Sequence, residues 1–265
     1  MALVENQGVA IFFEDVGAGA PVVLGHSFLC SGKMWREQVP ALARKFRVIN
    51  LDLRGHGRSG EVKRSFSLYD VVSDVVAVLD RLSIEKAVWC GLSIGGMVAL
   101  RAALTRPQRV SGLILLDTDA DAETAIRKLK YYAMGVGTRL LGVGPFLPSI
   151  VRLMFGATTR RQNRALVNEW KREFSGLQVP SVLRGLEALM RRDSLVARLE
   201  EVRVPALVLV GEEDRSLPPV LSRRIHAFLR GSTFVEIPAA GHLSALEQPA
   251  QVTEAILGFL EAHAS

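Results

Sequence analysis

Long apolar runs are missing from this chain of 265 residues, as are other marks of a membrane or secreted protein. No stretch approaches the roughly 18 uninterrupted apolar residues that a membrane-spanning helix needs. The first eight residues contain neither a basic region nor an apolar one, so we expect no secretory signal. If the chain is full length, these absences favour a cytoplasmic location and argue against a membrane partner.

Cysteine is also scarce. The chain has two, Cys30 and Cys90, which is too few for a disulfide framework. Neither belongs to a C-x-x-C or C-x-x-H cluster, so the sequence predicts no metal site. We interpret both as small hydrophobic core residues near the ends of strands.

The formal net charge of +6 is unevenly distributed, and no motif for recognising nucleic acid accompanies it. Residues 122–195 hold 13 of the 33 Lys and Arg but only 5 of the 27 Asp and Glu. Because the chain has no such motif, we expect no nucleic-acid partner. The basic excess either attracts an anionic substrate or partner, or it belongs to solvated helix faces. The residues concerned are Arg160, Arg161, Arg164, Lys171, Arg172, Arg191 and Arg192.

Strand-like and helix-like stretches alternate in the first 118 residues and again from about residue 200. This pattern is typical of a mostly parallel sheet with helices on both faces. We expect strands at 8–15, 21–25, 46–53, near 88, and at 113–116, 205–210 and 233–237. We expect helices at 34–43, 68–82, 94–106, near 219–228 and close to the C-terminus.

The alternation stops between residues 121 and 195, where helical patterns are interrupted by Gly and Pro. We interpret residues 121–195 as a helical lid inserted between two parts of one core, residues 1–120 and 196–265. Its large apolar side chains either line a substrate pocket or pack the lid on itself. They are Tyr131, Tyr132, Met134, Phe146, Met154, Phe155, Trp170, Phe174 and Met190.

A G-x-S-x-G pattern lies at residues 91–95, between a strand-like and a helix-like stretch. This context predicts a tight, strained strand-to-helix turn that exposes Ser93 as a nucleophile and tolerates only very small neighbours. The positive end of the following helix faces the site, so the Ile94 N–H is well placed to stabilise an oxyanion. An ordinary glycine-rich helix entry is the alternative.

A serine nucleophile needs a general base and a third group that orients the base. His242 lies on a loop of small residues after the last predicted strand, at the sheet edge where open α/β sheets bind ligands. A structural histidine is the alternative. The acid is expected between Ser93 and His242 in the chain, and the candidates are Asp214, Glu213 and Asp117. The other histidines, His26, His56, His226 and His263, fit this role less well.

Four separated motifs resemble those of the α/β-hydrolase superfamily, and the resemblance extends over nearly the whole chain. They are Gly25-His26-Ser27-Phe28, the D-x-R-G-x-G-x-S loop at 52–59 with Gly60, the serine turn, and Asp214 with His242. The resemblance implies an α/β-hydrolase fold with a mostly parallel eight-stranded sheet and an inserted helical lid. It also implies Ser93 as nucleophile, His242 as base, Asp214 as orienting acid, and the Phe28 and Ile94 backbone N–H groups as oxyanion hole. Many relatives have glycine where this chain has Ser27.

The type of nucleophile narrows the expected reaction. Haloalkane dehalogenases and epoxide hydrolases of this fold resemble one another in using aspartate at the turn, whereas this chain has Ser93. Residues 91–97, 107–110 and 247–249 are similar to those of 3-oxoadipate enol-lactonases and related cofactor-free esterases and perhydrolases. We therefore expect a hydrolase that cleaves a small-molecule ester or lactone through an acyl-enzyme and needs no metal or organic cofactor.

Two alternatives remain open at this stage. The first is a hydrolase of carbon–carbon bonds with the same fold and the same three side chains. The second is a small-molecule receptor that retains the triad and turns over little. The sequence also leaves open whether the chain is a monomer or a homo-oligomer.

Overall fold

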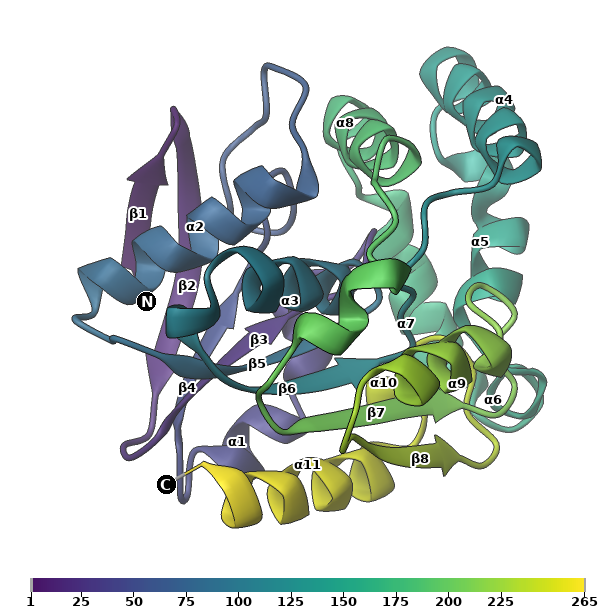
Figure 1. Ribbon diagram of the computed structural model, residues 1–265. Helices are drawn as coiled ribbons and strands as arrows, with labels where there is room; N and C mark the ends of the chain where they lie inside the picture. The colour runs from purple at the N-terminus through teal and green to yellow at the C-terminus, as the bar shows by residue number, and fades with distance from the viewer. Residues whose placement is uncertain (1, 265) are drawn as a thin grey trace.

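The computed structural model describes residues 2–264, which form an eight-stranded sheet of order β1-β2-β4-β3-β5-β6-β7-β8 (Figure 1). Strands β3 to β8 run parallel to one another, and β1 and β2 are antiparallel to their neighbours. This confirms the predicted mostly parallel sheet. The strands are β1 (Ala2–Asn6), β2 (Val9–Val16), β3 (Pro21–Gly25), β4 (Arg47–Leu51), β5 (Ala87–Leu92), β6 (Val110–Leu116), β7 (Ala206–Gly211) and β8 (Thr233–Ile237).

The central strands are buried on both faces of the sheet. In β5, Ala87 and Trp89 belong to one apolar cluster, whereas Val88 and Cys90 belong to the other. Successive side chains of a strand point to opposite faces, so an uninterrupted apolar stretch supplies both clusters. Each face of the sheet therefore needs a layer of helices to cover it.

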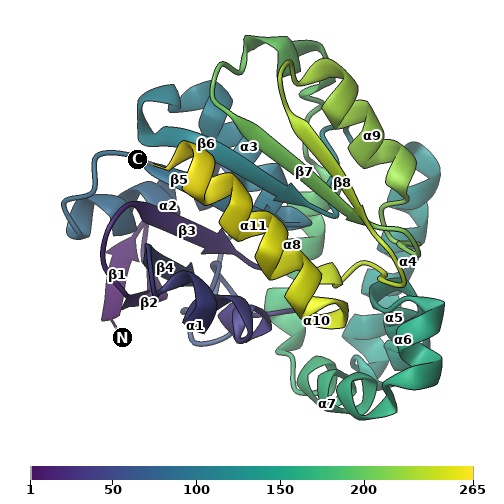
Figure 2. The same ribbon diagram turned by 90° about the horizontal axis from the view of Figure 1, so that it is seen from below.

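Helices supply that cover on both sides. Helices α2 (Leu68–Arg81), α3 (Ile94–Thr105) and α9 (Pro219–Phe228) pack on one face, and α1 (Gln38–Leu42) and α11 (Pro249–His263) pack on the other. Figure 1 shows α2 and α3 above the sheet and α1 and α11 below it, and Figure 2 shows α11 crossing the lower face. This arrangement leaves the carboxyl ends of the parallel strands for loops that carry function.

Five helices, called the cap helices below, separate β6 from β7. They are α4 (Ala125–Leu141), α5 (Leu147–Met154), α6 (Ala157–Gln162), α7 (Arg164–Ser175) and α8 (Val179–Met190). Helices α4, α5 and α6 lie beyond the carboxyl ends of β7 and β8 in both views (Figures 1 and 2). Among residues 2–264, no helix is both long and apolar enough to cross a bilayer.

The structure differs from the sequence-based expectation in two places near the N-terminus. The edge strand β1 was not predicted, because its side chains are mostly exposed and show little apolar patterning. The predicted helix at 34–43 is instead a 3₁₀ turn, η1 (Gly32–Trp35), followed by the short helix α1. Pro40 explains the break, because proline is tolerated only in the first turn of a helix.

The remaining short elements are the 3₁₀ turns η2 (Pro107–Arg109), η3 (Gly144–Phe146) and η4 (Val196–Glu201) and the single-turn helix α10 (Ser244–Glu247).

Candidate active site

Ser93 lies on the predicted turn between β5 and α3. Its backbone has φ 57° and ψ −115°, a conformation that is strained for a residue with a side chain. The surrounding chain holds it there: its N–H donates to the Leu116 carbonyl at 2.9 Å, and its carbonyl accepts from Thr118 Oγ1 at 2.7 Å. Both backbone groups of Ser93 are thus tied to the end of β6 and to the loop that follows it.

The glycines around Ser93 are required by close backbone contacts. A Cβ on Gly91 would lie 2.2 Å from the Gly95 carbonyl carbon, and a Cβ on Gly95 would lie 2.3 Å from the Gly25 oxygen. Real Cβ atoms do not approach other atoms so closely. A larger residue at either position would therefore push α3 away from β3 and β5. This explains why the pattern requires glycine on both sides of the serine.

His242 and Asp214 come together from two neighbouring loops. Asp214 follows β7 and His242 follows β8, and His242 Nδ1 lies 2.8 Å from Asp214 Oδ2. The other oxygen of Asp214 accepts from the Ser216 and Leu217 N–H groups at 2.8 and 3.0 Å. Burial disfavours protonation of His242, but the Asp214 carboxylate, together with the charges of Asp117 and Glu247, outweighs this effect and raises the pKa of His242 above its ordinary value.

The two competing acids are occupied elsewhere. Glu213 accepts hydrogen bonds from the N–H and hydroxyl of Thr158 at the start of α6. Asp117 accepts from the Gly211 N–H at 2.7 Å and from the Ser244 hydroxyl. Burial, reinforced by the Asp214 charge, raises the pKa of Asp117 well above its ordinary value. The geometry therefore favours Asp214 as the carboxylate that orients His242.

A further carboxylate, Glu247, supports the His242 loop, and nothing in its sequence context predicts this role. It is buried and accepts from the N–H groups of Gly241 at 2.9 Å, Leu243 at 3.2 Å and Gly156 at 2.8 Å. Burial raises its pKa. The contact with the Gly156 N–H ties the histidine loop to the cap. A single glutamate five residues after His242 gives no sign of these contacts in the sequence.

The predicted oxyanion residues flank Ser93 on two elements. Ile94 is the first residue of α3, so its N–H has no carbonyl partner within the helix. Phe28 lies in a turn closed by the Cys30 N–H donating to the Ser27 carbonyl at 3.0 Å, and Leu29 in this turn adopts φ 66°. Ser27 is not in the left-handed region, so this position does not need glycine; its buried hydroxyl has no hydrogen-bond partner within residues 2–264.

His26 and the D-x-R-G-x-G-x-S loop hold the Phe28 turn from behind. His26 Nδ1 lies 2.8 Å from the Ser27 carbonyl, and His26 Nε2 accepts from the Leu53 N–H at 2.8 Å. Burial, together with nearby His56, lowers the pKa of His26 to about 3, so the ring is neutral. Asp52 accepts from the Gly32 and Arg58 N–H groups at 2.7 and 2.8 Å. These motif residues are structural supports.

Ser93 and His242 line one small pocket of about 80 Å³ between the core and the cap helices. Its walls are mostly apolar, which suits an apolar part of a ligand. The core contributes Phe28 and Met97, and the cap contributes Tyr131, Met134, Leu186 and Leu189 among others.

The large apolar residues of the cap do not all lie in the same kind of place. Tyr131, Met134 and Met154 line the pocket with Ser93. Trp170 and Phe174 are fully buried in the apolar cluster on the α11 side of the sheet and pack together with ring centroids 6.0 Å apart. Some of these residues therefore line the cavity that contains Ser93 and others pack internally, whereas Tyr132 does neither, because its side chain is exposed.

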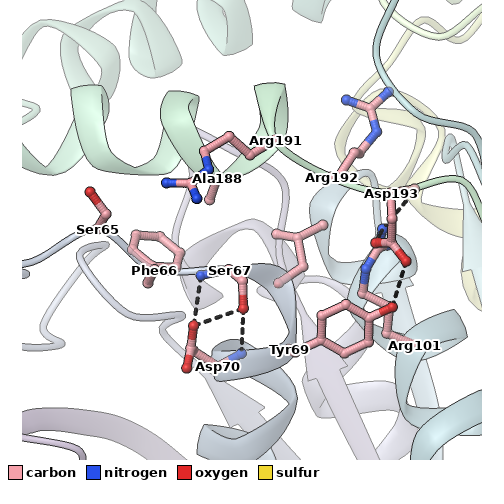
Figure 3. A pocket seen from close by; sticks show the side chains of 11 residues that line it. Ser65, Phe66, Ser67, Tyr69, Asp70, Arg101, Ala188, Arg191, Arg192 and Asp193 are labelled. Atoms are coloured by element: carbon pink, nitrogen blue, oxygen red, sulfur yellow. Dashed lines mark hydrogen bonds and ion pairs between the residues drawn. The ribbon is translucent and has the colours of Figure 1, made fainter.

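Of the seven basic residues singled out in the cap segment, Arg192 is the one that lines the pocket with Ser93. Figure 3 shows a neighbouring cavity, of about 300 Å³, between α2 and the end of α8. There Asp193 points toward Tyr69 and Arg101 and bonds both at 2.6 Å, whereas the Arg192 side chain points away from them. The ion pair of Asp193 with Arg101 anchors the end of α8 to α3.

Residues 2–264 contain no group of three or more His, Cys, Asp or Glu side chains placed to hold a metal ion. Cys30 and Cys90 are free and buried, as expected for core residues, and burial raises the pKa of both thiols.

The chain is similar to known proteins over most of its length. The family model described as the α/β-hydrolase fold matches residues 20–249. A thermophilic esterase from Thermogutta terrifontis is 30% identical and superposes with a TM-score of 0.94 over 99% of this chain and 97% of its own. The enol-lactonase from Burkholderia xenovorans LB400 is 25% identical, with a TM-score of 0.92 over 98% and 100%. A protein of Azorhizobium caulinodans whose name proposes a carbamate hydrolase is 28% identical, with 94% of each chain covered.

Proposed function

The chain belongs to the α/β-hydrolase family, and from that premise we propose that it is a serine hydrolase of carboxylic esters or lactones. The observation that carries the proposal is the arrangement of three side chains. Ser93 stands on a strained turn, His242 lines the same pocket, and Asp214 orients His242 from behind at 2.8 Å. Nucleophile, base and orienting acid are the parts that acyl transfer to water needs.

The reaction proceeds in two halves. His242 Nε2 removes the proton of the Ser93 hydroxyl as Ser93 Oγ attacks the acyl carbonyl, and then donates that proton to the departing alcohol oxygen. Water next attacks the acyl-enzyme, with His242 again as base, and releases the carboxylic acid and free Ser93. Asp214 holds the Nδ1–H tautomer and stabilises the imidazolium that forms in each half.

The negative charge that develops on the carbonyl oxygen is stabilised by the backbone N–H groups of Phe28 and Ile94. The Ile94 N–H belongs to the first turn of α3, where the helix dipole adds a positive potential. The strained Leu29 and the His26 contacts fix the Phe28 peptide before substrate arrives. Residues 121–195 act as a lid that closes the pocket and excludes water.

Similarity to an esterase and an enol-lactonase supports cleavage of a bond between an acyl carbon and oxygen. A panel of p-nitrophenyl esters, simple lactones, an enol-lactone with free carboxylates and a phenyl carbamate tests the proposal. We expect ester or lactone turnover that Ser93→Ala reduces by about 10⁴-fold or more. Turnover by Ser93→Ala within tenfold of wild type would refute the mechanism. Tight ligand binding without any hydrolysis would favour the receptor alternative.

A further inference from the structure

A buried ion pair lines the pocket next to the candidate catalytic residues. Arg192 follows the end of α8, and Glu123 precedes α4; both are 6% exposed. Arg192 Nη1 lies 2.9 Å from Glu123 Oε2. Both residues contribute to the wall that contains Ser93 and His242, in a lining that is otherwise mostly apolar.

The charges around this pair cancel. Arg192 Nη2 lies 3.4 Å from Asp119 Oδ2, and Arg127 Nε lies 3.6 Å from Glu123 Oε1. Two guanidinium groups thus face two carboxylates, and no net charge is left for a ligand.

Four of the five N–H donors of Arg192 already have partners; one of them is the Nη2 contact with Asp119. Its Nε donates to the Asp121 carbonyl at 2.9 Å, and its Nη1 donates to the Leu189 carbonyl at 3.0 Å as well as to Glu123. A substrate carboxylate in this pocket would therefore lose its water without gaining a free cation. Burying an unpaired charge is costly, whereas an apolar group is accepted by the Leu and Met walls.

We propose that the pocket selects substrates with an uncharged, apolar acyl group, and that Glu123 sets this preference by neutralising Arg192. The inference rests on the proposed serine hydrolase function, whose acyl group would occupy this pocket. The basic excess of residues 122–195 then has no part in attracting an anionic acyl group. Of the seven basic residues named above, Arg192 lines the pocket, and it is already paired with Glu123.

The test compares p-nitrophenyl butyrate with mono-p-nitrophenyl glutarate, which carries a free carboxylate on a similar chain. The wild-type protein is expected to prefer the butyrate in kcat/KM. Glu123→Gln removes one negative charge and keeps the shape of the side chain. We expect it to raise the glutarate-to-butyrate ratio by about tenfold or more, the gain typical of one hydrogen bond between charged partners.

Two further variants separate the local charge from other effects. Glu187→Gln makes the same charge change on α8, where Glu187 pairs with half-buried Arg184 and exposed Arg191 outside this pocket. The glutarate-to-butyrate ratio of this variant should stay at the wild-type value. The double variant Glu123→Leu with Arg192→Met replaces the buried pair by apolar groups, often without loss of stability. It should keep the preference for the butyrate.

The results that would refute this inference differ from those that would refute the proposed hydrolase function. A wild-type preference for the glutarate, or an equal rise in the ratio for Glu187→Gln and Glu123→Gln, would overturn the inference and leave the hydrolase function intact. If Glu123→Gln does not fold, as judged by its thermal unfolding, the wild-type preference and the double variant still decide. Hydrolysis of neither ester, together with no labelling of Ser93 by a fluorophosphonate, would instead refute the proposed function.

Discussion

His242 Nδ1 lies 2.8 Å from Oδ2 of Asp214, and both side chains are buried. A carboxylate at Nδ1 holds the proton on that nitrogen and leaves Nε2 as the basic atom toward the pocket. The second Asp214 oxygen is fixed by two backbone N–H groups, so the carboxylate has little freedom to turn toward another partner. This pair is the structural basis for assigning the acid.

Substitution of the three candidate acids should therefore have unequal effects. We expect Asp214→Asn to lower kcat/KM by about 10³- to 10⁴-fold, because the amide favours the wrong tautomer of His242. Glu213→Gln, whose native partner is Thr158, should stay within tenfold of wild type. Asp117→Asn should fall between the two. If Asp117→Asn or Glu213→Gln loses more kcat/KM than Asp214→Asn, and circular dichroism confirms that the variants fold, the orienting acid would have to be reassigned to that residue.

The pH dependence of kcat/KM should show the raised pKa of His242. The base must be neutral, so activity is lost as the pH falls through the pKa of His242. Because Asp214 raises that pKa, the midpoint of the acid limb should lie above 6.5, the ordinary value for histidine. The residual activity of Asp214→Asn should have its acid limb at lower pH. If the midpoint of the acid limb does not change in Asp214→Asn, a group other than His242 controls the pH dependence.

Two glycine substitutions should change stability in opposite directions. Gly95→Ala would place a Cβ 2.3 Å from the Gly25 oxygen, so we expect a loss of about 3 kcal/mol in the free energy of unfolding. Gly258→Ala, in α11, meets no atom within 4 Å and should gain about 0.5–1 kcal/mol from helix propensity. Urea unfolding measures both. A Gly95→Ala protein as stable as wild type would contradict the close approach of α3 to β3.

Chain-length preference should depend on the cap wall. Leu186 on α8 is buried and lines the pocket of about 80 Å³, so Leu186→Ala should enlarge it. We expect the ratio of kcat/KM for p-nitrophenyl octanoate over butyrate to rise by about tenfold, at a stability cost of about 2–3 kcal/mol. Leu140→Ala, on the exposed side of α4, is the matched control and should leave the ratio unchanged. An equal rise in both variants would show that the wall does not limit chain length.

The fold was largely predictable because its central strands are short apolar runs between turn residues. The residues of β8 and α9 match their predicted ranges, since glycine or proline bounds each of them. Strand β1 was missed because an edge strand that is mostly exposed shows little apolar alternation; Val4 is its one apolar side chain that packs on the core. The predicted helix at 34–43 was divided between Trp35 and Gln38, because Pro40 is tolerated only in the first turn of a helix that begins just before it.

The candidate site was predictable where local backbone geometry constrains the residue type. The turn at Ser93 requires glycine two residues before and two residues after it, and the sequence shows this as the G-x-S-x-G pattern. Glu247 and the pairing of Arg192 with Glu123 were not predictable, because each contact joins loops far apart in the chain through side chains that occur at many surface positions. The charge count of residues 122–195 could not reveal which of its arginines is buried and paired.

The central claim is that Ser93 is an activated nucleophile, and covalent labelling tests it most directly. The wild-type protein is incubated with a fluorophosphonate beside a known serine esterase, and the adduct is located by intact mass and peptide mapping. We predict one adduct on Ser93, its absence in Ser93→Ala, and slow labelling in Asp214→Asn. An unlabelled wild-type protein under conditions that modify the reference esterase, or an adduct on another residue that persists in Ser93→Ala, would contradict the account.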